Sequence, residues 1–302
     1  MAAKTREGST RTIRAVEPGK VDFIVSDGWS AFDVGRSPQP IPGFGICRAA
    51  CATESFKLLQ LAGVSTHYLG RVDSRTLRVR EFQIPGQKPL SGKAEGLVLP
   101  LEWLFRYEIG EKFRKRVRKG DISLEQLGLP PGTDISTVTK LPRVFIECST
   151  KFERRDRYLS DTEARALAGL DVEAWAAARG CVTHVAFILR QALDACGYDL
   201  LDGKVELGRT WDSRIVLVDV AGSPDEIRAR KRVNERLYCK EPLRQYLETL
   251  PWREELRIAQ DAHPDDSSTW PAYPVLPDEQ VGYMSALYRE YTFDYAGERV
   301  AA

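Results

Sequence analysis

The sequence predicts an α+β fold. Strand-like segments, rich in β-branched and aromatic residues, concentrate in the first third of the chain, whereas Ala/Leu-rich segments with helical periodicity concentrate in the second half. Strands and helices segregated in this way are typical of α+β proteins, because parallel α/β folds alternate them. Hydrophobic residues make up 43% and charged residues 29% of the 302 residues, so a disordered or fibrous chain is not expected.

The first part of the chain is expected to be mainly strands. Extended segments in residues 8–25 are interrupted by Pro18-Gly19, which predicts a hairpin. A helix is predicted from Arg48 to Ala62, because apolar residues recur at helical spacing and a glycine follows. The Gly-, Pro- and Lys-rich segment 85–96 is expected to be a loop. Further strands are expected at residues 66–72, 77–84 and 96–107.

The second half is expected to be mainly helical. Ser160 and Glu163 stand in the Ser-x-x-Glu arrangement of a capping box, which predicts a helix that begins there and runs toward Arg179. Residues 200–207 and 214–220 alternate like the two strands of a hairpin. Further helices are predicted over residues 182–196, 224–238 and 277–291, and a surface loop over residues 261–274.

The balance of charge limits the expected partners. Lys and Arg number 44 against 43 Asp and Glu, so the chain lacks the positive field of a nonspecific nucleic-acid-binding protein, and small-molecule substrates are expected. No apolar run suggests a membrane span or a signal peptide, so a cytoplasmic protein without a membrane partner is expected. Six scattered cysteines and three histidines do not predict a zinc site. The oligomeric state stays open, a homo-oligomer included.

The hairpin at residues 200–220 carries the clearest chemical pattern. Side chains two apart on a strand point the same way, so Asp202, Lys204 and Glu206 share one face. The returning strand brings Asp219 opposite this face. Carboxylates placed in this way suit Mg²⁺ bound with ATP, because Mg²⁺ prefers oxygen ligands. The alternative interpretation is the solvated outer face of an amphipathic hairpin.

Three weaker patterns also suggest a site. Gly8-Ser9-Thr10-Arg11 is a small-residue turn with a cation, which can bind an anion or can be an ordinary turn. Asp33 lies between Phe32 and Val34, either as a half-buried acid or as a residue that caps a turn. Residues 147–161 mix cations and acids, and could bind phosphate and carboxylate or form a solvated loop.

Taken in order along the chain, these patterns resemble the motifs of the SAICAR synthetase (phosphoribosylaminoimidazole-succinocarboxamide synthase) family. That family has a GKxRDIY turn, an SAFDV strand end, an IPGKG loop, a PVExxxR strand, an STK segment, a DxKxEfG hairpin and an SPDxxR element. The matching segments here are GSTRTIR (8–14), SAFDV (30–34), IPGFG (41–45), PLEWLFR (100–106), STK (149–151), DGKVELG (202–208) with Asp219, and SPDEIR (223–228).

The resemblance implies an antiparallel β N-terminal domain (residues 1–108) packed on a larger α+β domain (residues 109–302), with ATP in the cleft between them. It also implies an ATP-dependent carbon–nitrogen ligase of purine biosynthesis. Such an enzyme joins the amine of aspartate to the carboxylate of an aminoimidazole carboxylate ribonucleotide through an acyl phosphate. ATP and Mg²⁺ are the implied cofactors, because Mg²⁺ and cations stabilise the charge of phosphoryl transfer.

The resemblance further assigns roles to individual residues. Lys204 and Asp219 are the implied catalytic residues, and Glu206 and Asp219 the implied Mg²⁺ ligands. The residues implied to bind ATP are Gly8, Ser9, Thr10, Arg11, Glu102, Lys204, Glu206 and Asp219. Those implied to bind the other substrates are Asp33, Arg106, Ser149, Lys151, Asp202 and Arg228.

Some positions depart from the family pattern and leave other functions open. Ser9 and Phe44 stand where the family has lysines, and Gly110-Glu111 stands where it has a Gly-Ser pair. One alternative is a paralogue that amidates a different carboxylated heterocycle in nucleoside-antibiotic biosynthesis. Another is a nucleotide-binding pseudoenzyme or regulator. The retained charged hairpin argues against the regulator, because a protein that only scaffolds does not need to coordinate Mg²⁺.

Overall fold

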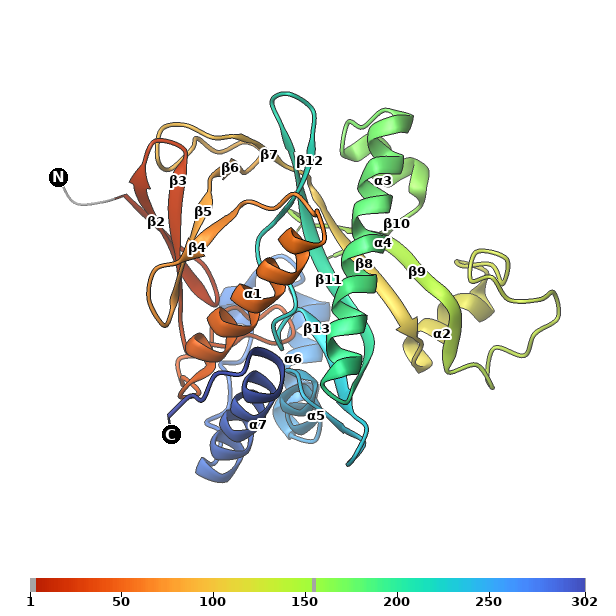
Figure 1. The fold of residues 1–302 in the computed structure, drawn as a ribbon. Coiled ribbons are helices and arrows are strands. Elements are labelled where there is room, and N and C mark those ends of the chain that lie inside the picture. The colour runs from red at the N-terminus through yellow and green to blue at the C-terminus, as the bar shows by residue number, and fades with distance from the viewer. Residues whose placement is uncertain (1–3, 154–155, 302) are drawn as a thin grey trace.

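Two β-sheets frame the protein, and the computed structural model describes residues 4–153 and 156–301 (Figure 1). The smaller sheet is antiparallel, with the strand order β1-β2-β3-β5-β4. The turn between β2 and β3 falls at Pro18-Gly19, so the hairpin predicted there is confirmed. The strands are β1 (Thr5–Glu7), β2 (Arg11–Glu17), β3 (Lys20–Val25), β4 (Tyr68–Arg71) and β5 (Thr76–Arg80).

The larger sheet is built around one long strand, β11 (Tyr198–Thr210). The first half of β11 pairs with β8 and β13, and its second half with β7 and β12. The hairpin predicted at residues 200–220 is therefore confirmed, as is the α+β class. The other strands are β6 (Phe82–Gln83), β7 (Gly96–Val98), β8 (Leu101–Glu108), β9 (Lys140–Thr150), β10 (Tyr158–Leu159), β12 (Ile215–Val218), β13 (Ile227–Lys231) and β14 (Arg236–Leu237).

The strands that precede residue 108 are divided between the two sheets. Residues 5–80 supply the smaller sheet, whereas β7 and β8 pair with β11 in the larger one. The chain therefore crosses between the sheets before residue 96. A domain boundary at residue 108 stays a prediction.

Seven α-helices lie in the described part of the chain, with one 3₁₀ turn (Ser267–Thr269). Helix α1 packs against α7 and α4, while α5 contacts α6 and α7 (Figure 1). Helix α1 contacts β3, β4 and β5 of the smaller sheet and α4 contacts the larger one, so this pair joins the two sheets, whereas α2 projects to the right in Figure 1. They are α1 (Phe44–Leu61), α2 (Glu111–Lys119), α3 (Asp161–Leu167), α4 (Val172–Ala195), α5 (Glu241–Glu248), α6 (Pro251–Ala262) and α7 (Asp278–Ala296).

Helix α4 covers one face of the larger sheet, where it contacts β8, β9, β11 and β12. Within the described residues it is the one helix long and apolar enough to cross a membrane, a criterion that core helices also meet. The sheet contacts of α4 account for its apolar character. Its buried residues recur at helical spacing and are Trp175, Ala178, Val182, Val185, Ala186, Leu189 and Leu193.

The helix predicted over residues 224–238 is wrong. These residues form β13, a turn and β14 instead. Arg228 and Arg230 alternate with the buried Ile227 and Ala229, which is the two-residue period of a strand. The high charge of the segment masked this period, because both arginines are used in ion pairs across the sheet.

The predicted helix boundaries also need correction. The capping box of Ser160 and Glu163 is confirmed, but the helix it begins, α3, ends before Gly169, whose φ is 61°. Residues 172–195 then form α4 without a break, where two helices were expected. Helix α1 begins at Phe44, four residues before the predicted start. Strand β9 was not predicted. Its last four residues belong to the charged segment 147–161, which was interpreted as a site or a solvated loop.

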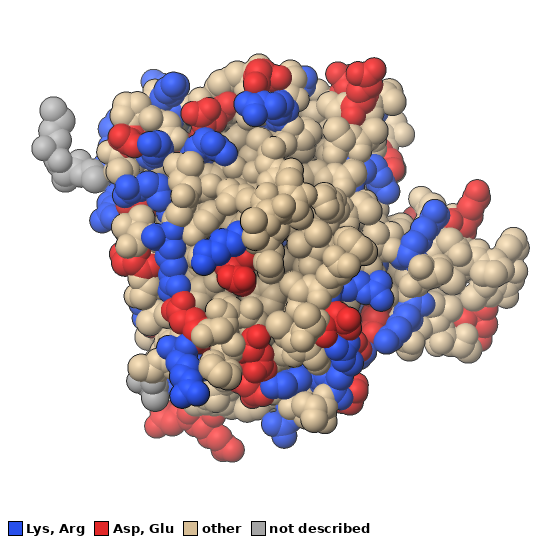
Figure 2. Space-filling view, in the orientation of Figure 1, with Lys and Arg blue, Asp and Glu red and all other residues tan. Residues whose placement is uncertain are grey.

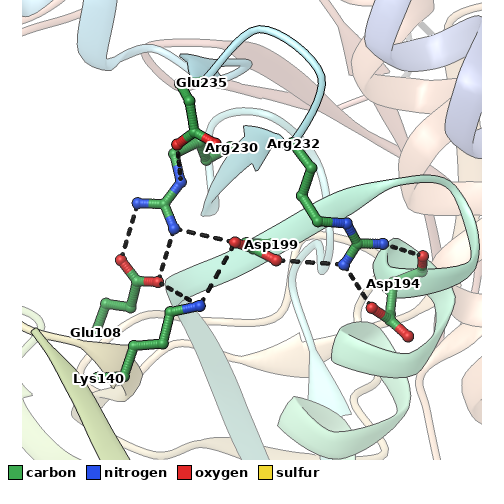
Figure 3. A network of polar contacts seen from close by, with 7 residues as sticks. All are labelled: Glu108, Lys140, Asp194, Asp199, Arg230, Arg232 and Glu235. Atoms are coloured by element: carbon green, nitrogen blue, oxygen red, sulfur yellow. Dashed lines mark hydrogen bonds and ion pairs between the residues drawn. The ribbon is translucent and has the colours of Figure 1, made fainter.

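A network of ion pairs ties together the edge of the larger sheet (Figure 3). Arg230 on β13 bonds both carboxylate oxygens of Glu108 on β8, at 2.8 and 3.0 Å, and also reaches Asp199 on β11 at 3.0 Å. Arg232 links the same Asp199 to Asp194 at the end of α4. These contacts pin β8, β11, β13 and α4 to one another at the end of the sheet remote from Asp219.

Figure 2 shows the surface from the same side as Figure 1. Basic and acidic side chains are interspersed around the rim of this face, and no single sign dominates it. This pattern agrees with the formal net charge of +1. Any anion must therefore be bound by a local group of cations.

Candidate functional site

The face of the larger sheet opposite α4 forms a polar floor. On β8, Trp103 and Phe105 point toward α4, so Glu102 and Arg106 point the opposite way. The register pairs Arg106 with Asp202 on β11, and pairs Glu102 with Ser149 on β9. Predicted site residues from β8, β9, β11 and β13 thus share one surface, which we call the polar floor. Its charged residues are Glu102, Arg106, Glu147, Asp202, Lys204, Glu206 and Arg228.

One end of the polar floor holds a buried pair of carboxylates. Glu206 on β11 pairs with Val218, the last residue of β12, and Asp219 directly follows β12. Their side chains are only 6% and 10% exposed. Lys151 forms an ion pair with Glu206, and Arg11 with Asp219. The turn at residues 8–10 thus brings Arg11, a predicted ATP-binding cation, to Glu206 and Asp219, the predicted Mg²⁺ ligands, which we call the metal corner.

The two carboxylates differ in their tendency to ionise. Burial and the charge of Asp219 raise the pKa of Glu206 above its ordinary value. Burial also opposes ionisation of Asp219, but Arg11, Lys151 and Lys204 hold its pKa below its ordinary value. A bound cation would relieve the repulsion between the two carboxylates.

His67 contacts the backbone of Asp219, a role that the sequence did not reveal. Its ring Nε2 lies 2.9 Å from the backbone oxygen of Asp219. Burial lowers the pKa of His67 to about 4, so the ring is neutral near pH 7. Asp219 has a φ of 66°, a left-handed conformation that costs roughly 1 kcal/mol or more in a residue other than glycine. Such strain is characteristic of functional sites.

Lys204 occupies the middle of the polar floor. Its Nζ lies 2.6 Å from Glu102 and 3.6 Å from Glu226. Burial would lower the pKa of Lys204, but Glu226, Glu102 and Glu206 outweigh it and raise the pKa well above its ordinary value. The ammonium is therefore charged, and suits an anion rather than the role of a general base.

The other end of the polar floor carries arginines. Arg106 donates to Glu147 at 2.8 Å and to Asp202 at 3.0 Å. Arg228 on β13 donates to the same Asp202, with Nε–Oδ1 at 2.7 Å. Arg106 is buried, whereas the side chain of Arg228 is 41% exposed. Arg228 can therefore turn toward a ligand while Arg106 holds the strands together.

Two cavities meet at the carboxylate pair. The first cavity, of about 240 Å³, lies over Glu102, Lys204 and the residues that follow β12. The second cavity, of about 100 Å³, opens between the two sheets and is walled by apolar side chains. The residues that line both cavities are Arg11, Lys151, Glu206 and Asp219. The apolar residues that line the second are Ile13, Val21, Phe23, Phe82, Ile84, Val98 and Val218.

The remaining predicted residues are placed as follows. Ser9 and Thr10 line the first cavity, and Gly8 donates its N–H to the oxygen of Arg11 at 2.8 Å in the turn behind them. Ser149 is buried on β9 beside Glu102, but lines neither cavity. Glu102 lines the first cavity, not the second.

Asp33 is exposed, so of the two alternatives the half-buried acid is wrong. It lies in a turn with Phe32, and both residues have left-handed φ values, 63° and 55°. Neither residue lines a cavity, although Ser30 and Ala31 line the first one. Arg154 and Arg155, part of the charged segment 147–161, lie outside the described residues.

The sequence also missed a buried group beside the first cavity. Arg48 on α1 forms an ion pair with Asp225 at 2.9 Å, and Tyr288 on α7 donates to Asp225 at 2.6 Å. Asp225 belongs to the SPD segment, which drew attention to Arg228 alone. The partners come from helices more than 60 residues away, so no local pattern could have shown the group.

An α+β fold with two cavities that share buried carboxylates and cations is the kind of site that suits an enzyme acting on anionic substrates. The sequence model of SAICAR synthetase matches residues 4–258. The chain belongs to the SAICAR synthetase family.

Relatives with known names agree with this family. A relative from Archaeoglobus fulgidus is 31% identical over 94% of this chain and 90% of its own length. A relative from Syntrophotalea carbinolica is 30% identical over 91% and 88%, and one from Thermoplasma volcanium 29% identical over 82% and 82%. Both of the latter are named phosphoribosylaminoimidazole-succinocarboxamide synthase.

Solved structures agree with the fold. A SAICAR synthetase in complex with ADP is similar to this chain with a TM-score of 0.69 at 22% identity, and covers 99% of this chain and 100% of its own. A SAICAR synthase from Saccharomyces cerevisiae, complexed with SAICAR, gives a TM-score of 0.72 at 20% identity and covers 98% and 95%. The predicted α+β architecture of the family is therefore confirmed.

Proposed function

We propose that the protein forms an amide between the amine of aspartate and the carboxylate of an aminoimidazole carboxylate ribonucleotide, with ATP and Mg²⁺. The observation that carries this proposal is the meeting of two cavities at one buried group, Glu206 and Asp219 with Arg11 and Lys151. A phosphoryl group that moves from one cavity to the other must pass these four side chains. The names of the relatives and the neighbour structures with ADP and with SAICAR support the same assignment.

The second cavity suits the base of ATP. Most of its walls are apolar side chains, chiefly from β2, β3, β6, β7 and β12, which favour a flat aromatic ring, and Arg6, Arg80 and Glu81 also line it. Arg11 and Lys151 lie at the end that the two cavities share, where the phosphates would extend. The turn at residues 8–10 would add backbone N–H groups to the same phosphates.

Glu206 and Asp219 are the residues that would hold Mg²⁺. Within the described residues, no group of three or more His, Cys, Asp and Glu side chains could bind a metal alone. Two carboxylates nevertheless fit Mg²⁺ that arrives with a nucleotide, because phosphate oxygens and water complete its coordination. Their burial and mutual repulsion favour a cation between them. When bound, Mg²⁺ neutralises charge on the transferring phosphoryl group.

The polar floor suits the acceptor. A nucleotide laid along it would place its phosphate near Arg228 and its carboxylate near Lys204. A carboxylate oxygen attacks the γ-phosphorus, the bond to the bridging oxygen breaks, and ADP leaves. The amine of aspartate then attacks the acyl carbon and loses a proton, while inorganic phosphate leaves. The charged Lys204 would stabilise the anions that form in both steps.

A second candidate is a paralogue that acts on a different carboxylated heterocycle. One observation favours it: Phe44, where the family has a lysine, lines the first cavity and stacks on Tyr288 at 3.8 Å. This aromatic wall replaces a cation beside the acceptor. Glu111 carries less weight, because Arg118 neutralises it at 2.7 Å on the exposed face of α2. A pseudoenzyme or regulator is the third possibility.

One assay separates these functions. Purified protein is incubated with ATP, Mg²⁺, aspartate and the aminoimidazole carboxylate nucleotide, and ADP and the mass of the product are measured. Efficient formation of the succinocarboxamide supports the proposal. ADP release with another carboxylated heterocycle alone would support the paralogue. Binding of ATP without turnover of any acceptor would support the regulator.

A further inference from the structure

Lys240 is a cation without a counter-ion in the first cavity. It occupies the N-cap position of α5, without a side-chain capping hydrogen bond, and lines the first cavity but not the second. Among the described residues, no ion pair or hydrogen bond of its ammonium is found. The other cations around this cavity all have carboxylate partners, namely Arg11 with Asp219, Arg48 with Asp225, Lys151 with Glu206, Lys204 with Glu102, and Arg244 with Glu241.

The carboxylate that acts most strongly on Lys240, that of Asp225, is already neutralised. Both carboxylate oxygens of Asp225 are already engaged, one by Arg48 at 2.9 Å and the other by the Tyr288 hydroxyl at 2.6 Å, so Asp225 does not neutralise a second cation. Burial, together with the neighbouring charges of Arg244 and Lys204, lowers the pKa of Lys240 despite the acids nearby. A desolvated cation without a partner is unfavourable, and a bound anion would remove that cost.

Arg244 stands beside Lys240. The two residues are four apart, so they share one face of α5, and both line the first cavity. The partner of Arg244 is Glu241 one turn earlier, at 3.5 Å, and the side chain of Arg244 is 38% exposed. A contact of that length and exposure is weak and can be exchanged for a ligand.

The phosphates of the proposed reaction have other cations. Arg11 and Lys151 lie where the two cavities meet, and Arg228 lies at the far end of the polar floor. Lys240 and Arg244 are therefore left for the third reactant, the amine donor. A succinocarboxamide product requires a donor with two carboxylates, which matches two cations on one helix face.

We propose that Lys240 and Arg244 bind the two carboxylates of the amine donor, an amino dicarboxylate, and so select it over other amines. This inference rests on the proposed function. The two carboxylates would hold the donor so that its amine faces the acyl phosphate near Lys204. Lys240 and Arg244 touch the donor and take no part in the phosphoryl transfer.

The test separates the donor from the other substrates. Hydroxylamine traps an acyl phosphate as a hydroxamate and has no carboxylate, so it does not need Lys240 or Arg244. The variants Lys240→Met and Arg244→Met should therefore form hydroxamate from ATP and the acceptor at the wild-type rate. Each should raise KM for aspartate about 10- to 100-fold, the usual effect of losing one hydrogen bond between charged groups. Succinate should compete with aspartate in the wild type, and more weakly in both variants.

Two controls complete the design. Lys57→Met removes an exposed lysine on α1 and should leave every constant unchanged. Lys240→Arg keeps the charge and should restore most of the affinity for aspartate. The inference is overturned if both methionine variants keep the wild-type KM for aspartate, or if they lose hydroxamate formation in parallel with ligation. A wild-type protein that forms hydroxamate but no aspartate product overturns the donor assignment alone, whereas one that forms neither overturns the proposed function as well.

Discussion

Lys204 on β11 and Glu102 on β8 form an ion pair with an Nζ–Oε1 distance of 2.6 Å, in the middle of the polar floor. The pair lies between the carboxylates of the metal corner and the arginines at the other end. The pKa of Lys204 is raised by the acids around it, so its charge is constant throughout the working pH range. Lys204 is thus a fixed positive charge at the point where the acceptor carboxylate would react.

Lys204→Met should abolish most of the ligase activity. The substitution removes a charge that stabilises the reacting anions, and kcat should fall about 100- to 1,000-fold, as when a fixed donor is lost from an oxyanion site. ADP release and product mass measure the effect. Lys204→Arg, which retains the charge, should recover part of kcat. Wild-type kcat in Lys204→Met would remove this residue from the mechanism.

Asp219→Asn should block the use of Mg²⁺ and ATP without unfolding the protein. The amide keeps the shape of the side chain but loses the charge that pairs with Arg11, so catalysis should fall by about 100-fold or more. The matched control is Asp212→Asn in the exposed turn of the same hairpin, whose side chain is 62% exposed and which should retain full activity. Steady-state kinetics at several Mg²⁺ concentrations distinguish the two. Full activity of Asp219→Asn would show that the metal assignment is wrong.

Several parts of this site could be predicted because they depend on local spacing. Asp202, Lys204 and Glu206 share a face wherever β11 is a strand, since side chains alternate along it. The turn at residue 211 then brings Asp219 to Glu206. Arg11 was also predicted, as an ATP-binding residue, from the ordered motifs and not from any local rule. Its ion pair with Asp219, which joins residues 208 positions apart, was not predicted.

Other parts could not be predicted because they depend on contacts between distant elements. His67 reaches the backbone of Asp219 because the segment before β4 pairs with β12, through a parallel bridge between Thr66 and Leu217. Arg48 and Tyr288 neutralise Asp225 from two helices that pack together only in the folded protein. Glu147 can be buried on strand β9 because Arg106 and Arg116 both neutralise its carboxylate, each at 2.8 Å. A charged segment can therefore form a strand. The pattern of polar and apolar residues along the sequence does not show such pairings.

Arg228 and Arg106 should give opposite results when each is changed to methionine. Arg228→Met should raise KM for the acceptor nucleotide about 10- to 100-fold and leave the fold intact, because Asp202 keeps Arg106. Arg106→Met removes a buried cation from two buried carboxylates. The free energy of unfolding should fall by roughly 2–3 kcal/mol, below the usual cost of a broken buried pair, because Asp202 and Glu147 each keep one arginine.

Denaturant unfolding and acceptor kinetics together test this contrast. The expected pattern is a change in KM without a change in stability for Arg228→Met, and a loss of stability for Arg106→Met. If Arg106→Met is as stable as the wild type and only KM changes, Arg106 contacts the acceptor directly. If Arg228→Met leaves KM unchanged, the phosphate of the acceptor lies elsewhere.

Asp22 should control the acid stability of the smaller sheet. It is 1% exposed on β3 and is paired with Arg78 on β5 at 2.9 Å and with Arg14 on β2 at 3.0 Å. Burial alone would raise the pKa of Asp22, but the two arginines outweigh it and hold the pKa below its ordinary value. Because the pKa is lower in the folded state, the stabilisation is complete above the unfolded pKa of about 3.9, and is lost as the pH falls through the folded pKa.

Asp22→Asn should therefore lower the free energy of unfolding at pH 7 by roughly 1–3 kcal/mol, a value reduced from that of a fully buried pair because both arginines are partly exposed. The difference from the wild type should be constant from about pH 5 upward and should shrink below about pH 4, since the wild-type carboxyl then gains its own proton. Urea unfolding at a series of pH values measures both features. Glu255→Gln on the exposed face of α6 removes the same unit of charge and should show neither effect. A loss of stability in Asp22→Asn that persists unchanged below the folded pKa would mean that side-chain packing, and not ionisation of Asp22, stabilises the sheet.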